Sequence, residues 1–160
     1  MVTVHIPDRV QVYVLSADKE VPEAEQCKIK FKILNMYQTL ELGNAIDVSE
    51  EVDSEGKVVY EEVEGEQVAK TKTTILKSAI LVSMLMENII SIENYTVVTK
   101  DGTATKVDWN VDWDEAHKAK QLELMTIPHR LEIAMNMCNS SNGLTEDEVK
   151  NSSGQSTPAT

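Results

Sequence analysis

The residues whose spacing comes closest to a metal site lie ahead of the C-terminal part of the chain. Asp108, Asn110 and Asp112 alternate with other residues, as the first oxygen ligands of a calcium-binding helix-loop-helix do. That motif continues with a glycine and a glutamate, at the positions where this chain has Trp113 and Ala119. The stretch is therefore predicted to be a half-buried strand that leads to a helix capped by Asp112.

The histidines and cysteines do not form a recognisable catalytic pattern. His5, His117 and His129 are far apart in sequence and lack the accompanying cysteines or spaced carboxylates of a zinc site. Cys27 and Cys138 are expected to be unpaired thiols, because the chain starts without the pattern of a secretory signal. Phosphate-binding glycine loops and hydrolase motifs are also missing from the sequence. We expect a non-enzymatic protein with no catalytic residue, no cofactor and no metal.

The charge composition limits the kinds of molecule that the chain is expected to bind. The chain has 160 residues, with 15 Lys plus Arg against 27 Asp plus Glu, and a formal net charge of −12. So negative a chain is not expected to bind nucleic acid phosphates or anionic membranes. Its length suits one domain, which we place at residues 1–150.

A strongly acidic stretch interrupts the chain at residues 47–66, where nine carboxylates accompany the single Lys57. A turn signal at residues 53–56 divides it. We predict that residues 44–70 leave the core either as a solvated hairpin or as a mobile insertion. The functional alternative is a docking arm for a basic partner or a mimic of nucleic acid.

The longest apolar run, residues 74–92, is predicted to be a helix, and its apolar residues surround most of the cylinder. Such a helix needs cover on more than one side, from the rest of the chain or from another chain. Its charged and serine residues make it a poor membrane span. Several apolar residues are candidates for a partner-binding surface rather than for the core. They are Leu81, Met84 and Leu85, together with the methionines Met135 and Met137 further along.

The remaining patterns predict an α+β fold. The expected strands are residues 2–6, 10–15 and 28–34, the last with isoleucine and phenylalanine on one face and lysine on the other. A hairpin is expected around Asp101-Gly102. The expected helices are residues 35–43 with Asn35 as N-cap, 114–125, a further segment from Pro128 that ends at residues 139–143, and a last turn at 145–150. Residues 151–160 are predicted to be a disordered tail.

Taken together, these features resemble the tail assembly chaperones of tailed bacteriophages. The likeness covers about residues 25–155 and rests on KIKFKILNMYQTLEL, on the long apolar helix, on the Asp101-Gly102 hairpin before a helical C-terminal half, and on LTEDEVKNSSGQS near the end. The resemblance implies a non-enzymatic protein of the infected host cytoplasm. It would keep the tape measure protein soluble, recruit tail tube subunits and be absent from the finished virion. We expect it to be a homo-oligomer.

Two other functions remain open. One is a component of the virion itself, such as a head decoration, neck or tail-completion protein, in which the apolar helix would lie in an interface between subunits. The other is an acidic inhibitor that mimics nucleic acid. It would compete for a basic enzyme through Glu61, Glu62, Glu64 and Glu66.

Overall fold

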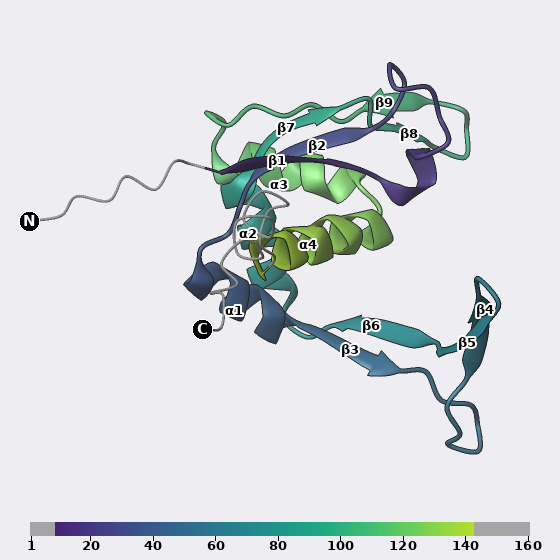
Figure 1. Cartoon of the computed structure of the whole chain (residues 1–160). Helices are drawn as coiled ribbons and strands as arrows, with labels where there is room; N and C mark the ends of the chain where they lie inside the picture. The colour runs from purple at the N-terminus through teal and green to yellow at the C-terminus, as the bar shows by residue number, and fades with distance from the viewer. Residues whose placement is uncertain (1–8, 143–160) are drawn as a thin grey trace, which may run out of the picture.

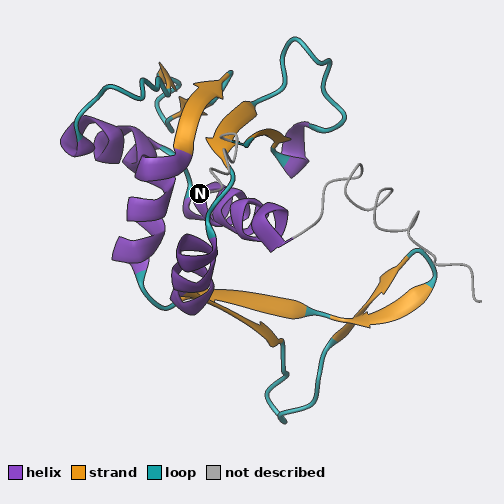
Figure 2. Ribbon diagram, turned by 60° about the vertical axis from the view of Figure 1, so that its left-hand side comes forward, coloured by secondary structure: helices purple, strands orange, loops and turns teal. Residues whose placement is uncertain are grey.

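The computed structural model describes residues 9–142, which form a body and a projecting arm (Figure 1). In this part of the chain, the body holds four α-helices and a three-stranded sheet, and the arm is built only of strands and turns (Figure 2). The predicted α+β class is confirmed. The predictions made for residues 2–6, 145–150 and 151–160 lie outside the described residues.

The sheet of the body contains strands β1 (Val10–Val14), β2 (Lys28–Lys32) and β7 (Ile89–Glu93), all antiparallel, in the order β1-β2-β7. A short 3₁₀ turn, η1 (Ser16–Asp18), follows β1. In β2, Ile29 and Phe31 are completely buried and the lysines point outwards. The predicted alternation of this strand is confirmed, because one face meets the core and the other meets solvent.

Helix α1 (Met36–Ala45) begins with the predicted cap. The Asn35 side chain accepts a hydrogen bond from the Gln38 N–H at 2.9 Å, and the Gln38 side chain accepts one from the Asn35 N–H at 3.1 Å. This reciprocal pair satisfies two donors that the first turn would otherwise leave free. The helix runs past the expected stop, Gly43, and turns directly into strand β3.

The helix predicted over residues 74–92 is shorter than expected. Helix α2 covers only Ser78–Asn88, and it lies between strand β6 (Thr71–Ile75) and strand β7. The residues at both ends are rich in β-branched side chains, which fit a pleated strand well. They gain partner strands in the fold, β3 for β6 and β2 for β7, and this pairing overrides the apolar pattern of a long helix.

The hairpin predicted around Asp101-Gly102 is present as β8 (Thr96–Val98) and β9 (Ala104–Lys106). Gly102 has φ of +85°, a conformation that favours glycine. The strand predicted after it is wrong: residues 107–113 contain only turns and irregular backbone. In this segment Trp109 donates its indole N–H to the Ile89 carbonyl at 2.9 Å. A side-chain hydrogen bond, rather than strand pairing, therefore holds the segment against β7.

The helical C-terminal half is confirmed by α3 (Glu115–Leu124) and α4 (Ile127–Asn142). The N-cap of α3 is Asp114, whose side chain accepts the His117 N–H, and not the predicted Asp112. Pro128 occupies the first turn of α4, where the missing N–H of proline costs nothing. Ile133 and Met137 of α4 are completely buried in the core that the sheet and helices share.

A carboxylate joins α4 to the start of the chain. One oxygen of Glu132 accepts the Tyr13 O–H at 2.7 Å and the Ser16 N–H at 2.6 Å. Burial opposes ionisation of Glu132, but the two donated hydrogen bonds outweigh it and hold its pKa below the usual 4.5. Burial, followed by the contact with Glu132, raises the pKa of Tyr13 to about 12.

The arm comprises residues 46–75. Its stem pairs β3 (Ile46–Glu50) with β6, and a distal hairpin pairs β4 (Tyr60–Val63) with β5 (Glu66–Ala69). Between stem and distal hairpin the chain makes a second small loop, closed by a bridge between Val52 and Val58. Figures 1 and 2 both show the arm extending away from the helices on the side opposite the sheet β1-β2-β7.

Candidate protein-binding surfaces

The five residues predicted to bind a partner lie mostly inside the body. Leu85 and Met137 are completely buried, Leu81 and Met84 are only 2% and 4% exposed, and Met135 is half-buried against the same core. Leu81, Met84 and Leu85 of α2 and Met137 of α4 are therefore core residues of the chain itself, not an open partner-binding surface. The chain itself covers this helix, with α1, α3 and α4 packed against it. A helix that is apolar nearly all round is stable only with such cover.

The arm is the opposite case, because it has no core of its own. No residue from 47 to 74 is buried. Its backbone is paired, but a two-stranded ribbon without a covered face is at best marginally stable in water. Several large apolar side chains stand exposed along it. They are Val48, Val52, Tyr60, Val63 and Val68.

Backbone hydrogen bonds fix the point where the arm branches. The Glu51 N–H donates to the Lys70 carbonyl at 2.7 Å, the Val59 N–H to the Glu51 carbonyl at 2.8 Å, and the Lys70 N–H to the Val59 carbonyl at 2.8 Å. These three bonds join the stem, the small loop and the distal hairpin in a ring. Residues 44–70 were predicted to leave the core as a hairpin or as a mobile insertion; the structure has a branched hairpin that starts at Ile46, because α1 continues to Ala45. The sequence signal for its second turn is Glu64-Gly65.

That second turn has both central residues at positive φ, +52° for Glu64 and +84° for Gly65. Two such residues match the twist of a tight two-residue hairpin, although the first is more often asparagine or glycine. In the small loop, the Asp53 side chain accepts the N–H groups of Glu55 and Lys57, and Gly56 has φ of +80°. Glycines at positive φ and hydrogen bonds between nearby residues therefore shape both turns of the arm, the small loop and the tip of the distal hairpin.

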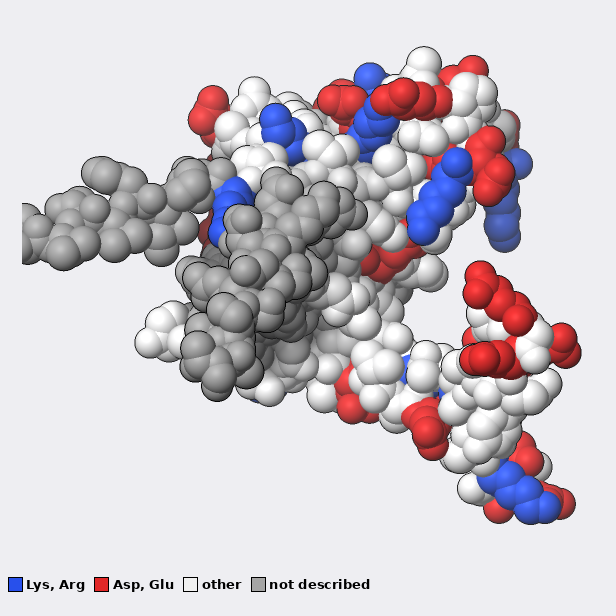
Figure 3. All heavy atoms as spheres, in the orientation of Figure 1, with Lys and Arg blue, Asp and Glu red and all other residues white. Residues whose placement is uncertain are grey.

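The arm carries nine carboxylates and three lysines. Two exposed ion pairs neutralise part of this charge, Lys70 with Glu51 at 3.3 Å and Lys57 with Glu55 at 3.2 Å. Within residues 9–142, the four glutamates of the distal hairpin form no ion pair, and they lie at positions 61, 62, 64 and 66. Figure 3 shows these carboxylates gathered on the arm. The tip of the arm is consequently both apolar and strongly negative.

A second exposed apolar surface lies on α1. Met36, Tyr37 and Leu40 are 69%, 78% and 60% exposed, and they sit within the first two turns of the helix. Helical spacing places Met36 and Leu40 on one face. The sequence did not predict their exposure, because the same apolar residues are typical of the buried side of a short helix.

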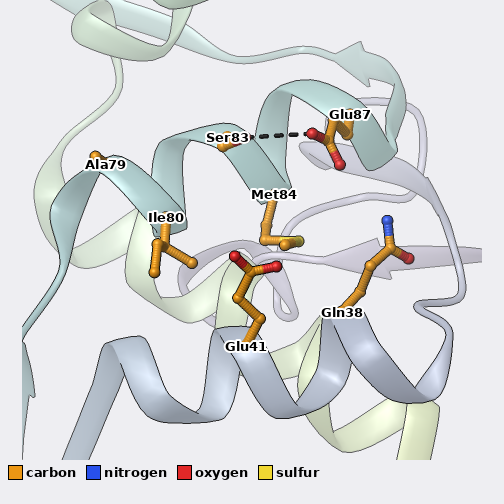
Figure 4. Close-up of a pocket in the computed structure, with 7 residues that line it drawn as sticks. All are labelled: Gln38, Glu41, Ala79, Ile80, Ser83, Met84 and Glu87. Carbon is orange, nitrogen blue, oxygen red and sulfur yellow. Dashed lines mark hydrogen bonds between the residues drawn. The ribbon is translucent and has the colours of Figure 1, made fainter.

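A groove of about 290 Å³ separates α1 from α2 (Figure 4). Ile80, Met84 and Glu87 line it from α2, and Glu41 of α1 lies beside Met84 between the two helices. The Ser83 hydroxyl donates to Glu87 at 3.3 Å. The remaining lining residues are Gln38 and Ala79. Its chemistry suits an apolar side chain with a positive or hydrogen-bonding end, rather than an anion.

A hollow of about 420 Å³ is lined by Cys27, Tyr95 and His129, among other residues. Side chains of these types can act in catalysis, so their environment is informative. Burial, reinforced by the charges of Asp18 and Glu132, raises the pKa of the Cys27 thiol to about 12. A nucleophilic cysteine needs the opposite shift. The His129 ring nitrogen is engaged by the Tyr95 hydroxyl at 2.8 Å, and that hydroxyl accepts the Thr126 N–H. These contacts tie β7 and the following hairpin to α4.

In the segment with calcium-like spacing, the side chain of Asn110 shapes the backbone, and the neighbouring Asp114, which lies outside that pattern, caps α3. The Asn110 side chain accepts the Asp112 N–H at 2.9 Å, and the Asp114 side chain accepts the His117 N–H at 2.8 Å. The hydrogen bond from the His117 N–H, followed by the one with the His117 ring at 3.1 Å, holds the pKa of Asp114 below its usual value. Residues 9–142 contain no group of three histidine, cysteine or acidic side chains placed to hold a metal ion.

Two further findings bear on these surfaces. Among residues 9–142, no helix has the length and apolar character needed to cross a bilayer. The chain matches no protein-family model, no curated protein and no solved structure.

Proposed function

We propose that this protein is a non-enzymatic assembly factor that binds other polypeptide chains through its arm. The observation that carries the proposal is the arm itself, in which residues 47–74 include no buried side chain. Such a segment gains little from folding alone, and its exposed valines and tyrosine offer apolar area to a partner. The exposed side of α1 provides a second contact surface.

Within this role, the resemblance to tail assembly chaperones favours the tape measure and tail tube proteins of a bacteriophage as partners. A tape measure protein is a long helical chain with apolar stripes, which need cover until the tail is built. A strongly negative carrier with exposed valines can shield such stripes and still resist aggregation. The proposed place of action is the cytoplasm of the infected host.

Co-expression with the tape measure and tail tube proteins of the same phage tests this function. The informative variant is Val63→Asp with Val68→Asp on the distal hairpin, and its matched control is Val98→Asp with Val111→Asp, two exposed valines outside the arm. We expect the wild-type and control proteins to keep the tape measure soluble and to co-purify with it, and the arm variant to do neither. Equal recovery of soluble tape measure with all three proteins would contradict the proposal.

A second candidate is a component of the virion, and the same arm favours it, because an arm without a core can lie across the neighbouring subunit of a ring. Mass spectrometry of purified particles separates the two functions. Stoichiometric copies of the chain in the particle support the virion component, and its absence supports the assembly factor.

A third candidate, an acidic mimic of nucleic acid, is supported by the four glutamates of the distal hairpin, which form no ion pair with any residue of the described part of the chain. It requires that the protein inhibit a basic DNA-binding enzyme, and that glutamine at positions 61, 62, 64 and 66 abolish the inhibition. If the glutamine variant inhibits as well as the wild type, this candidate is excluded.

A further inference from the structure

The outer face of the sheet β1-β2-β7 has a composition unlike the rest of this acidic chain. The register places Val10 opposite Lys32, Val12 opposite Lys30, and Val14 opposite Lys28, and on β7 it places Ser91 opposite Lys30 and Glu93 opposite Lys28. Directly opposed residues in an antiparallel pair point to the same face. Ile29 and Phe31 point the other way, into the core. We call this set of three valines and three lysines the Val–Lys face.

The Val–Lys face is open within the described part of the chain. Val10 and Val12 are 43% and 54% exposed, and Lys30 and Lys32 are exposed and form no ion pair with residues 9–142. Lys28 alone is engaged, with Glu23 at 3.2 Å. Most of the blue side chains in view in Figure 3 lie on the upper part of the body that holds this sheet, and few lie on the arm.

The distal hairpin presents the matching pattern with the opposite charge. Its register places Glu61 opposite Val68 and Val63 opposite Glu66, so these four side chains share one face. Val63 and Val68 are 47% and 45% exposed, and neither glutamate is paired within residues 9–142. We call this set the Val–Glu face. Each of the two faces therefore combines half-exposed valines with a pair of like charges, Lys30 and Lys32 or Glu61 and Glu66, that form no ion pair within residues 9–142.

We infer, on the basis of the proposed arm-mediated function, that the Val–Lys face is the docking site for the Val–Glu face of a second copy of this chain. Contact would bury valines against valines and bring carboxylates to Lys30 and Lys32, which form no ion pair among the residues that the structure describes. Complementary charges of this kind set the orientation of a contact and raise its rate of formation.

The two faces belong to different copies because of where the arm lies. The stem leaves the body on the side away from the sheet, as both ribbon views show. The contact is thus head-to-tail: each copy gives its arm to one neighbour and receives an arm from another. Repeating such a contact produces a ring when the rotation closes and a filament when it does not.

The test is sedimentation velocity of the full-length protein over a concentration series at low and high salt. We expect concentration-dependent association that weakens as salt screens the charges. The variants are Lys30→Glu with Lys32→Glu on the sheet, and Glu61→Lys with Glu66→Lys on the arm. Each pair should weaken association at least about tenfold, because like charges then face each other. A control matched to the sheet variant, Lys100→Glu with Lys106→Glu on the β8–β9 hairpin, makes the same change in net charge as that variant and should associate as the wild type does.

Exchanging the charges of the two faces tests whether the Val–Lys face and the Val–Glu face contact each other. Mixing the sheet variant with the arm variant, or combining all four substitutions in one chain, should restore association, since each acidic face again meets a basic one. Circular dichroism and thermal melting should show that every variant remains folded.

Three outcomes would overturn the inference: a wild-type protein that stays monomeric throughout, variants that associate like the wild type, or a charge swap that restores nothing. It is also overturned if association responds to neutralising Glu146, Asp147 and Glu148 but not to the arm variant, because the acidic C-terminal segment would then be the occupant. A monomeric protein that still holds the tape measure soluble would leave the proposed function standing.

Discussion

Glu132 shows how one side chain can join elements far apart in sequence. It accepts hydrogen bonds from Tyr13 and Ser16, so a single carboxylate fastens α4 to β1 and to the turn after it. Because the donors favour the ionised form, this link depends on pH.

Replacing Glu132 by glutamine should lower the free energy of unfolding by about 1 kcal/mol near pH 7, since hydrogen bonds to a charged acceptor are stronger than those to a neutral one. The folded-state pKa lies below the usual 4.5, so the extra stability is present above that pH and is lost as the pH falls through the folded-state value. Urea unfolding of both proteins from about pH 7 to about pH 3 measures this. A gap between the two proteins that stays constant over the series would contradict it.

Cys27 gives a second prediction at the residue scale. Burial raises the pKa of its thiol to about 12, so almost no thiolate forms near pH 8. We expect iodoacetamide to modify Cys27 in the native protein far more slowly than in the urea-unfolded protein, as mass spectrometry of the peptide would show. Equal rates in both states would mean that the thiol is reached without unfolding.

At the scale of elements, α2 and α1 differ in what their apolar residues do. Leu85 of α2 is completely buried between neighbouring helices, whereas most of the Leu40 side chain on α1 is exposed. The same residue type therefore stabilises the fold at one position and remains open to a partner at the other.

Truncating these two leucines makes the difference measurable. Leu85→Ala should cost about 2–5 kcal/mol of stability, because it leaves a cavity in a packed core. Leu40→Ala should change stability by less than about 0.5 kcal/mol, since an exposed position loses few contacts. Chemical unfolding of both variants checks the pair. A small loss for Leu85→Ala would show that α2 is not the centre of the core.

At the scale of the whole molecule, the chain divides into a body with a continuous core and an arm with none. The body joins the β1-β2-β7 sheet to four helices through shared buried residues. The arm depends on backbone pairing and on its turns. Local stability should follow this division, because segments with few buried contacts open most easily.

Hydrogen exchange should therefore separate the two parts. We expect backbone amides of residues 47–74 to exchange much faster than those of β2 and α2, and to slow down when the arm is bound by a partner. Exchange mass spectrometry of the protein alone and in its assembled form measures both effects. Protection of the free arm equal to that of β2 would show that the arm has cover within a single copy.

Local chemistry in the sequence by itself determined several features that the structure confirms: the two-faced strand β2, the Asn35 cap of α1, the Asp101-Gly102 hairpin and the departure of the acidic stretch from the core. Each depends on residues close together in the chain, so their pattern was sufficient. The composition likewise indicated the negative charge that the arm carries.

Only the tertiary structure decided where α2 ends, that Leu81, Met84 and Leu85 are core, and that residues 107–113 are not a strand. These outcomes depend on partners distant in sequence: β2 pairs with the isoleucines after α2, and three helices cover its apolar surface. The pairing of Val10 with Lys32 is of the same kind. An apolar pattern states that a side chain needs cover, but only the arrangement of the whole chain determines which segment provides it.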